Sequence, residues 1–267
     1  MSETTPRARR PGRLQGKAAI VSGAGSRGPG VGNGKATAVL FAREGARVLL
    51  LDAVLERAEE TLALIEAEHG EGFARRADVT SAADCRAAVE AAVERYGRLD
   101  ILDNNVGIGG AGSVVEVAED EWDRVMRANV TSVMLLSKYA VPAMRASGGG
   151  SIINISSISA LRPKGLTAYS TSKGAIIALT RAMAVDHGRQ GIRVNCIAPG
   201  PVFTPMVSEG MTEASRERRR LASLLQIEGT AWDIGWAAVY LASDEARYVT
   251  GIVLTVDGGV TVTSNDR

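Results

Sequence analysis

The chain has 267 residues, 45% of them hydrophobic and 23% charged, which is the composition of an ordinary globular protein. Its formal net charge of +1 gives no overall field that would select nucleic acid or an anionic membrane. The lack of a long apolar run and the counts of 2 cysteines and 2 histidines exclude a transmembrane helix, a disulfide framework and a zinc site, so we expect a protein of the reducing cytoplasm.

The first segment, residues 1–13, is rich in arginine and contains Arg7, Arg9, Arg10 and Arg13. It has no apolar core, so it is not a secretory signal, and we expect a short solvated tail. Binding of nucleic acid through these arginines is a weaker alternative that no motif supports.

Short β-branched strands then alternate with amphipathic helices almost to the end of the chain. The predicted strands cover residues 17–22, 47–52, 72–79, 99–105, 151–156, 193–197 and 252–256. The predicted helices cover residues 34–44, 55–68, 82–96, 119–146, 168–188, 208–225 and 231–242. This order predicts a single doubly wound α/β domain over residues 14–260, with a mostly seven-stranded parallel sheet covered by helices on both faces. Residues 261–267 are expected to form a C-terminal tail.

A glycine-rich turn joins the first strand to the first helix. It runs from Ser22 to Gly34 and contains 6 glycines, of which Gly23, Gly32 and Gly34 are the best candidates for phosphate contact. Glycine lets the backbone approach a pyrophosphate closely, and a helix N-terminus offers free N–H groups. We therefore predict a dinucleotide site, with a mobile loop as the alternative.

Asp52 ends the second strand, where an acid would accept hydrogen bonds from the adenine ribose and repel a 2′-phosphate. A pair of like charges 4 Å apart costs roughly 4 kcal/mol at an effective dielectric near 20, so we predict NAD over NADP. Arg27 is a counter-signal, because a base in the glycine-rich turn could pair with a 2′-phosphate. An ordinary strand-end turn residue is the alternative for Asp52.

Tyr169 and Lys173 lie four residues apart on a predicted helix and therefore share a face. A free tyrosine has a pKa of about 10, and a nearby ammonium favours the phenolate and lowers that pKa. With Ser157 upstream to hold an oxygen, the group suits proton transfer to or from a carbonyl or alcohol. A surface pair with a solvated lysine is the alternative.

Several segments, in order along the chain, resemble the short-chain dehydrogenase/reductase family over about residues 14–260. They are the glycine-rich turn with Asn33, Asp78-Val79, Asn104-Asn105-Val106-Gly107, Asn129-Val130, Asn154-Ile155-Ser156-Ser157 before Tyr169 and Lys173, Arg193-Val194-Asn195 before Pro199-Gly200, and Val249-Thr250-Gly251 before Val256-Asp257-Gly258-Gly259. The resemblance implies an NAD(P)-binding Rossmann fold and hydride transfer at nicotinamide, coupled to proton transfer.

The resemblance also implies a role for each matching residue. Tyr169 would be the general acid–base, Lys173 would lower its pKa and bind the nicotinamide ribose, and Ser157 would hold the substrate oxygen. Asn129 would anchor a water in the proton relay. Further cofactor contacts would come from Asp78, Val79, Asn105, Val106, Gly107, Pro199, Gly200, Val202 and Thr204.

The chain departs from the family pattern in three places. Eight residues separate Gly23 from Gly32, so the turn is about five residues longer than usual. The usual spacing of 13 residues before Tyr169 selects Ser156, whereas the strand-end register selects Ser157. We favour Ser157, because a register shift would turn the side chain to the other face. Asp103 interrupts an apolar strand, and a buried carboxylate needs partners.

The segment after Pro199-Gly200 is expected to cover the substrate, either as an apolar lid or as a surface helix with a solvated charged face. Its apolar residues are Met206, Val207, Met211, Leu221, Leu224 and Leu225, around the basic stretch 216–220. Arg162 and Lys164 could favour an anionic substrate or be rim charges. The resemblance implies a homotetramer built on the helices 119–146 and 168–188.

Two functions follow from these patterns. The first is an NAD(H)-dependent oxidoreductase that interconverts a secondary alcohol and a ketone. The second is a non-catalytic dinucleotide-binding sensor or scaffold on the same fold. A sensor has no need of Asn129, a serine, Tyr169 and Lys173 together, so the sequence favours the enzyme.

Overall fold

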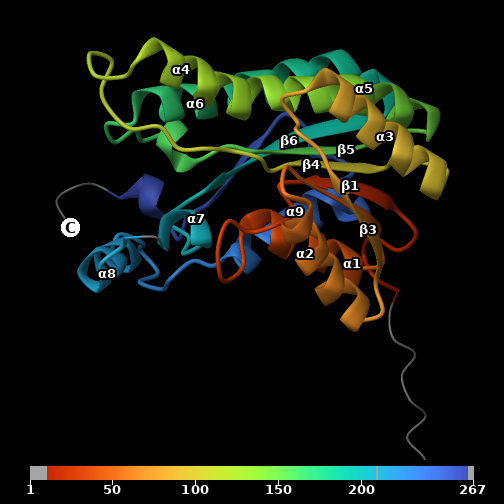
Figure 1. Ribbon diagram of the computed structural model, residues 1–267, viewed down its shortest axis with the longest axis horizontal. Coiled ribbons are helices and arrows are strands. Elements are labelled where there is room, and N and C mark those ends of the chain that lie inside the picture. The colour runs from red at the N-terminus through yellow and green to blue at the C-terminus, as the bar shows by residue number, and fades with distance from the viewer. Residues whose placement is uncertain (1–10, 209, 264–267) are drawn as a thin grey trace, which may run out of the picture.

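The computed structural model describes residues 11–208 and 210–263, whose strands form one seven-stranded parallel sheet (Figure 1). The strands lie in the order β3-β2-β1-β4-β5-β6-β7. Their bounds are β1 (Ala18–Ser22), β2 (Arg47–Asp52), β3 (Glu71–Arg76), β4 (Ile101–Asn104), β5 (Gly150–Ile155), β6 (Ile192–Pro199) and β7 (Val253–Val256). The order reverses between β1 and β4, which is where an open α/β sheet forms its ligand crevice. The predicted doubly wound fold is confirmed.

Helices cover both faces of the sheet (Figure 1). One layer holds α3 (Ala82–Tyr96), α4 (Glu119–Met126), α5 (Ser132–Ala146) and α6 (Thr167–His187). The opposite layer holds α1 (Asn33–Arg43), α2 (Leu55–Ala67) and α9 (Ala231–Ala242). The short helix α7 (Pro205–Ser208) and α8 (Glu213–Leu221) lie together at one end of the molecule.

The central strands are apolar throughout because both of their faces are buried. Alternate side chains of a strand point to opposite faces. Val21 and Leu50 thus belong to the hydrophobic cluster beneath α1 and α9, whereas Ile20 and Leu49 belong to the cluster beneath α3 and α5. All of these side chains are fully buried. This two-sided burial explains why the strands read as continuous apolar runs.

Two predicted helices are interrupted in the structure. The predicted helix 119–146 consists of α4 and α5 joined by a π-helical turn, Arg127–Thr131, which holds Asn129. The predicted helix 208–225 is confirmed only in part: α7 ends at Ser208, Gly210 has a φ of +69°, and α8 covers Glu213–Leu221. The Thr212 hydroxyl accepts a hydrogen bond from the Ser215 N–H and so caps the new helix.

The described part of the predicted N-terminal tail is attached to the domain. The Arg13 N–H donates to the Glu44 carboxylate at 2.8 Å, and the Arg13 side chain pairs with Glu245. Arg7, Arg9 and Arg10, on which the nucleic-acid alternative rests, lie outside the described residues. At the other end, Val260–Val262 forms a 3₁₀ turn within the described chain.

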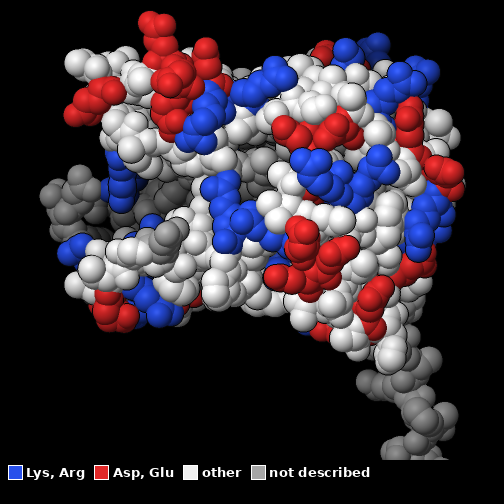
Figure 2. Space-filling model, in the orientation of Figure 1, with Lys and Arg blue, Asp and Glu red and all other residues white. Residues whose placement is uncertain are grey.

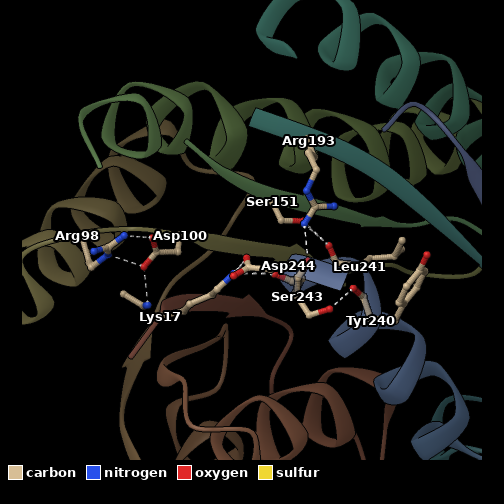
Figure 3. Close-up of polar contacts among 11 residues, drawn as sticks. Lys17, Arg98, Asp100, Ser151, Arg193, Tyr240, Leu241, Ser243 and Asp244 are labelled. Atoms are coloured by element: carbon tan, nitrogen blue, oxygen red, sulfur yellow. Dashed lines mark hydrogen bonds and ion pairs between the residues drawn. The ribbon is translucent and has the colours of Figure 1, made fainter. Parts of the chain in front are cut away.

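Paired polar groups close the amino ends of the strands (Figure 3). The Asp100 carboxylate accepts hydrogen bonds from the Ala18 N–H at 2.9 Å and from Arg98 at 2.6 and 2.8 Å. The Arg193 guanidinium donates to the carbonyls of Leu241 at 2.7 Å, Ser243 at 3.2 Å and Val249 at 3.3 Å. These partners compensate the charges for the loss of water.

Candidate active site

A cleft of about 400 Å³ opens at the carboxyl ends of the strands, between the loops that follow them. Figure 2 shows the molecule hollowed between its two helical layers, with basic side chains beside the hollow. Every residue predicted to bind the cofactor lines this cleft, as do Ser157, Tyr169 and Lys173, whereas Asn129 is fully buried behind it. The cofactor-side lining consists of Gly23, Arg27, Gly32, Asn33, Gly34, Asp52, Asp78, Val79, Asn105, Val106, Gly107, Pro199, Gly200, Val202 and Thr204.

The glycine-rich turn presents backbone rather than side chains to the cleft. Gly23 has a φ of +63°, and a Cβ at Gly34 would overlap the Gly23 carbonyl. The first turn of α1 contains no acidic residue, and Gly32 at its N-cap supplies no side-chain cap. The free N–H groups and positive dipole end of α1 therefore suit a pyrophosphate, and the turn fits a dinucleotide.

The lengthened part of this turn spans the mouth of the cleft. The Ser26 hydroxyl accepts a hydrogen bond from the Gly32 N–H at 2.9 Å, which folds the extra residues back on the turn. The Arg27 guanidinium donates to the Gly107 carbonyl at 3.1 Å, and Gly30 approaches Pro205 on the other side. Arg27 is thus engaged at the rim of the cleft. Ser26 was not predicted as a site residue, although its place before the inserted glycines is a signal for a turn cap.

Asp52 and Asp78 line the end of the cleft next to β2 and β3. The Asp52 carboxylate accepts hydrogen bonds from the Gly25 N–H at 3.2 Å and the Val54 N–H at 3.0 Å. The Asp78 carboxylate accepts from the Thr80 N–H and hydroxyl at 2.9 and 2.8 Å. Arg57 of α2 also lines this end, and helical periodicity gave no sign of it. It is a second base, besides Arg27, in the lining of the cleft.

Tyr169, Ser157 and Lys173 meet on the wall of the cleft. The Ser157 side chain hydrogen-bonds the Tyr169 phenol, and its hydroxyl also accepts from the Ser159 N–H at 3.1 Å. The Lys173 Nζ lies 5.7 Å from the centre of the Tyr169 ring and donates to the Ile155 carbonyl at 2.9 Å. Lys173 is only 3% exposed, so the alternative of a solvated surface lysine is wrong.

The two adjacent serines point to different partners, as successive residues of extended chain should. The Ser156 hydroxyl donates to the Lys173 carbonyl at 2.7 Å and so ties the strand end to α6. Ser157, still extended with φ of −164°, reaches the Tyr169 phenol. The structure therefore brings Ser157, rather than Ser156, to the side chain of Tyr169.

Burial shifts the pKa values of Tyr169 and Lys173 in this part of the cleft. It raises the pKa of Tyr169, and the hydrogen bond with Ser157 offsets part of the rise. Desolvation of the phenolate outweighs the hydrogen bond with Ser157, so the net shift of the Tyr169 pKa is upward, and its lowering by Lys173 stays a prediction. Burial also lowers the pKa of Lys173 to about 8, which still leaves the ammonium mostly charged at neutral pH.

Asn129 is held behind the cleft by hydrogen bonds through its whole amide. Its Oδ1 accepts from the Ile108 N–H at 2.7 Å, and its Nδ2 donates to the Ile108 carbonyl at 3.0 Å and to the Ser172 hydroxyl at 2.9 Å. The Ser172 hydroxyl in turn donates to the Tyr169 carbonyl at 2.7 Å. Sequence analysis missed Ser172, although it precedes Lys173 directly. These bonds link the π-helical turn to the helix that carries Tyr169.

Asp103 is fully buried between Val21 and Ile153 of the neighbouring strands. Within the described chain, neither of its carboxylate oxygens has a hydrogen-bond partner. Burial raises the pKa of Asp103 to about 8. The expected burial is confirmed, but the partners that a buried carboxylate needs are not found among the described residues.

The substrate end of the cleft is bordered by Met206, Val207 and Arg219. Leu221 and Leu225 of the predicted apolar lid are 50% and 66% exposed and do not line the cleft. Arg162 donates to the Val260 carbonyl at 2.7 Å and the Thr263 hydroxyl at 3.0 Å, so it contacts the C-terminal segment. Sequence analysis had noted Arg219 only as part of a basic stretch.

Neither a metal site nor a membrane-spanning helix is found within residues 11–208 and 210–263. No cluster of three or more histidine, cysteine or acidic side chains is arranged to hold a metal ion. No helix in this part of the chain is both long and apolar enough to span a bilayer.

Comparisons with known proteins agree with this geometry. The family model described as enoyl-(acyl carrier protein) reductase matches residues 30–261. The chain is 38% identical over 251 residues to 2-(R)-hydroxypropyl-CoM dehydrogenase of Xanthobacter autotrophicus, covering 92% of this chain and 98% of that protein. A crystal structure of a short-chain dehydrogenase/reductase from Burkholderia xenovorans matches with a TM-score of 0.91 and 40% identity, covering 95% of this chain and all of that one. A 7α-hydroxysteroid dehydrogenase solved with NADH and 7-oxo glycochenodeoxycholic acid matches with a TM-score of 0.86 and 37% identity, covering 92% of this chain and 95% of that one.

Proposed function

The chain belongs to the short-chain dehydrogenase/reductase family of oxidoreductases, which act on CH–OH groups, and we propose that it interconverts a secondary alcohol and a ketone with NAD(H). One observation carries the proposal. The side chains of Ser157, Tyr169 and Lys173 converge on one wall of a cleft that is also lined by the glycine-rich turn, which suits a pyrophosphate. A bound nicotinamide supplies or accepts the hydride.

Tyr169 is proposed as the general acid–base. Its raised pKa keeps the phenol protonated at neutral pH, which suits donation of a proton to the oxygen of a ketone as the carbonyl becomes an alcohol. Ser157, hydrogen-bonded to the same phenol, would hold that oxygen. In the direction of oxidation, the charged Lys173 would stabilise the phenolate that accepts the alcohol proton.

Asn129 and Ser172 are proposed as positioning residues. The Asn129 amide is engaged with Ile108 and Ser172, so its side chain has little capacity left for the water of the predicted relay. Through Ser172 and the Tyr169 carbonyl, it fixes the backbone that presents the phenol. The proposed role is therefore to hold Tyr169 in place rather than to pass a proton.

NAD is proposed as the preferred cofactor because Asp52 lines the adenosine end of the cleft. Its charge opposes a 2′-phosphate by roughly 4 kcal/mol at contact distance. Arg27 and Arg57 also line the cleft, and their positive charges would attract a 2′-phosphate. Comparison of kcat/KM for NAD and NADP with one substrate tests the choice, and a preference for NADP would show that the two bases outweigh Asp52.

A screen of secondary alcohols and ketones, followed at the nicotinamide absorbance, tests the activity itself. Turnover with at least one ketone supports the enzyme. Tight binding of NADH with no turnover across the panel would favour a dinucleotide-binding sensor.

A homotetramer remains a proposal for the assembly. The proposal is supported by large hydrophobic side chains that are exposed at the surface of the domain. Two of them, Trp236 and Tyr248, are 46% and 96% exposed. Light scattering coupled to gel filtration measures the mass directly, and a monomer would overturn it.

A further inference from the structure

The arginines of α8 fall into different environments. Arg216 pairs with Glu228 at 2.7 and 2.6 Å, and Arg220 pairs with Glu217 at 2.8 and 2.6 Å. Each of these pairs is bidentate, so both oxygens of each carboxylate are engaged. Arg218 is exposed and donates to the Ser215 hydroxyl at 2.8 Å.

Arg219 differs from its neighbours because it lines the cleft. It is half-buried, and its Nη2 donates to the Val202 carbonyl at 3.2 Å. No ion pair joins Arg219 to a carboxylate among the described residues. A guanidinium carries several N–H donors in a planar fork, and the bond to Val202 uses one of them. The remaining donors are available to a ligand in the cleft.

The charges along the cleft point to the sign of that ligand. Of the described residues that line it, the acidic ones are Asp52, which ends β2, and Asp78, which follows β3. Arg219 and Val202 lie at the opposite end, beyond β6, and share it with Lys173. Because the sheet order places β6 four strands from β2, the acids do not neutralise the substrate end.

Desolvation strengthens this argument. Burial lowers the pKa of Arg219, and the nearby Glu228 offsets part of that effect. A partly buried guanidinium without an ion pair of its own is a cost to the fold, and an anionic ligand would remove that cost. Met206 and Val207 line the same region, so the ligand has an apolar part beside its charge.

We propose that Arg219 binds an oxyanion on the substrate, so that the ketone or alcohol turned over here carries a carboxylate or similar acid group joined to its reacting carbon by an apolar segment. This inference rests on the proposed function, because it assigns the substrate class of the same site. The same fork could instead meet a phosphate of the dinucleotide, and the test below separates these two sources.

The test uses oxo acids paired with their ethyl esters, which keep the ketone and remove the charge. Wild-type protein, Arg219→Met, Arg219→Lys and the control Arg218→Met are each assayed for kcat/KM with both members of each pair. Calorimetry measures NADH binding to each variant, and then binding of each acid and ester to the NAD-loaded protein. Arg218→Met removes an arginine from the same helix but outside the cleft.

We expect the wild type to prefer the acid over its ester by on the order of tenfold to a hundredfold, as one charge-assisted bidentate contact allows. Arg219→Met should lose this preference through KM, Arg219→Lys should keep part of it, and Arg218→Met should keep all of it. NADH affinity should stay within about threefold in every variant.

Three results would overturn the assignment. One is an acid and ester treated alike by the wild type. Another is a preference that survives in Arg219→Met. The third is weaker NADH binding in Arg219→Met with the acid preference intact, which would assign the fork to the cofactor phosphate. Arg219-dependent binding of the acid without turnover would support the inference while contradicting the proposed oxidoreductase activity.

Discussion

Two charged side chains at the amino ends of the strands differ in their partners from two basic side chains of the cleft, which lies at the carboxyl ends. At the amino ends, Asp100 and Arg193 are surrounded by protein partners, so their charges are compensated within the fold (Figure 3). At the carboxyl ends, Lys173 and Arg219 have only a backbone carbonyl as their hydrogen-bond partner among the described residues. This difference in partners distinguishes residues that stabilise the sheet from residues whose donors are available to a ligand.

Substitutions at the amino ends should therefore lower stability, whereas substitutions in the cleft should lower turnover. Loss of a paired group at the amino ends leaves its partner unsatisfied and lowers the free energy of unfolding. Loss of an unpaired group in the cleft removes a cost to the fold and is expected to impair catalysis instead. Lys173→Met and Asp100→Ala are therefore each assayed for both stability and turnover.

Lys173→Met should have the largest effect on turnover. The variant removes the charge beside Tyr169, and kcat is expected to fall by about 10³-fold, within the range for a displaced acid–base system. Its melting temperature should stay equal or rise, because burial lowers the pKa of Lys173 to about 8 and thus already disfavours the ammonium in the folded state. Steady-state kinetics and calorimetry on one preparation check both halves. A kcat within tenfold of wild type would remove Lys173 from the mechanism.

Asp103→Asn should give the next largest effect, and it depends on pH. Burial raises the pKa of Asp103 to about 8, whereas an unfolded aspartate titrates near pH 4. The proton is therefore held by the folded state, and stability present below about pH 4 is lost as the pH rises through 8. The asparagine variant lacks this titration.

Urea unfolding between pH 4 and pH 9 measures the difference. The advantage of Asp103→Asn over wild type is expected to grow by roughly 5 kcal/mol across that range. Comparison of the two slopes cancels any constant cost of burying the amide. Parallel profiles would show that Asp103 ionises normally and that its carboxylate is solvated or paired in solution.

Asp100→Ala should be smaller in energy and confined to stability. The substitution strips the Ala18 N–H and Arg98 of their acceptor, which is expected to cost about 2 kcal/mol of unfolding free energy. Turnover per folded molecule should be unchanged, because the network lies at the far ends of the strands from the cleft. Glu90→Ala, which breaks the exposed pair with Arg86, is the matched control and should cost at most about 0.5 kcal/mol. An Asp100 variant that loses activity while folded would break the division between the two ends.

The fold and most of the cleft follow from local sequence patterns. The apolar strands predicted the sheet because both faces are buried, and the carboxyl ends of its parallel strands meet at one edge, which gathers Gly34, Asp52 and Ser157. The π-helical turn at Arg127–Thr131 was not predictable, because one widened turn leaves the apolar periodicity nearly intact.

Side-chain direction and burial were the other unpredictable features. A basic stretch at residues 216–220 does not reveal that Arg219 alone among the arginines of α8 lines the cleft in the described chain. The spacing of Tyr169 and Lys173 placed both on one helix face. It could not predict that the phenol is buried, and this burial raises the pKa of Tyr169. Interactions set by packing across elements are invisible to a pattern read along one element.

The central claim, that Tyr169 moves the proton in a nicotinamide oxidoreductase, is tested most directly with Tyr169→Phe. The variant keeps the ring and removes the hydroxyl that Ser157 contacts. We predict NADH binding within about twofold of wild type, an unchanged fold, and a kcat lower by on the order of 10³-fold with any ketone that the wild type reduces. A variant that binds NADH and retains near-normal turnover would contradict the account.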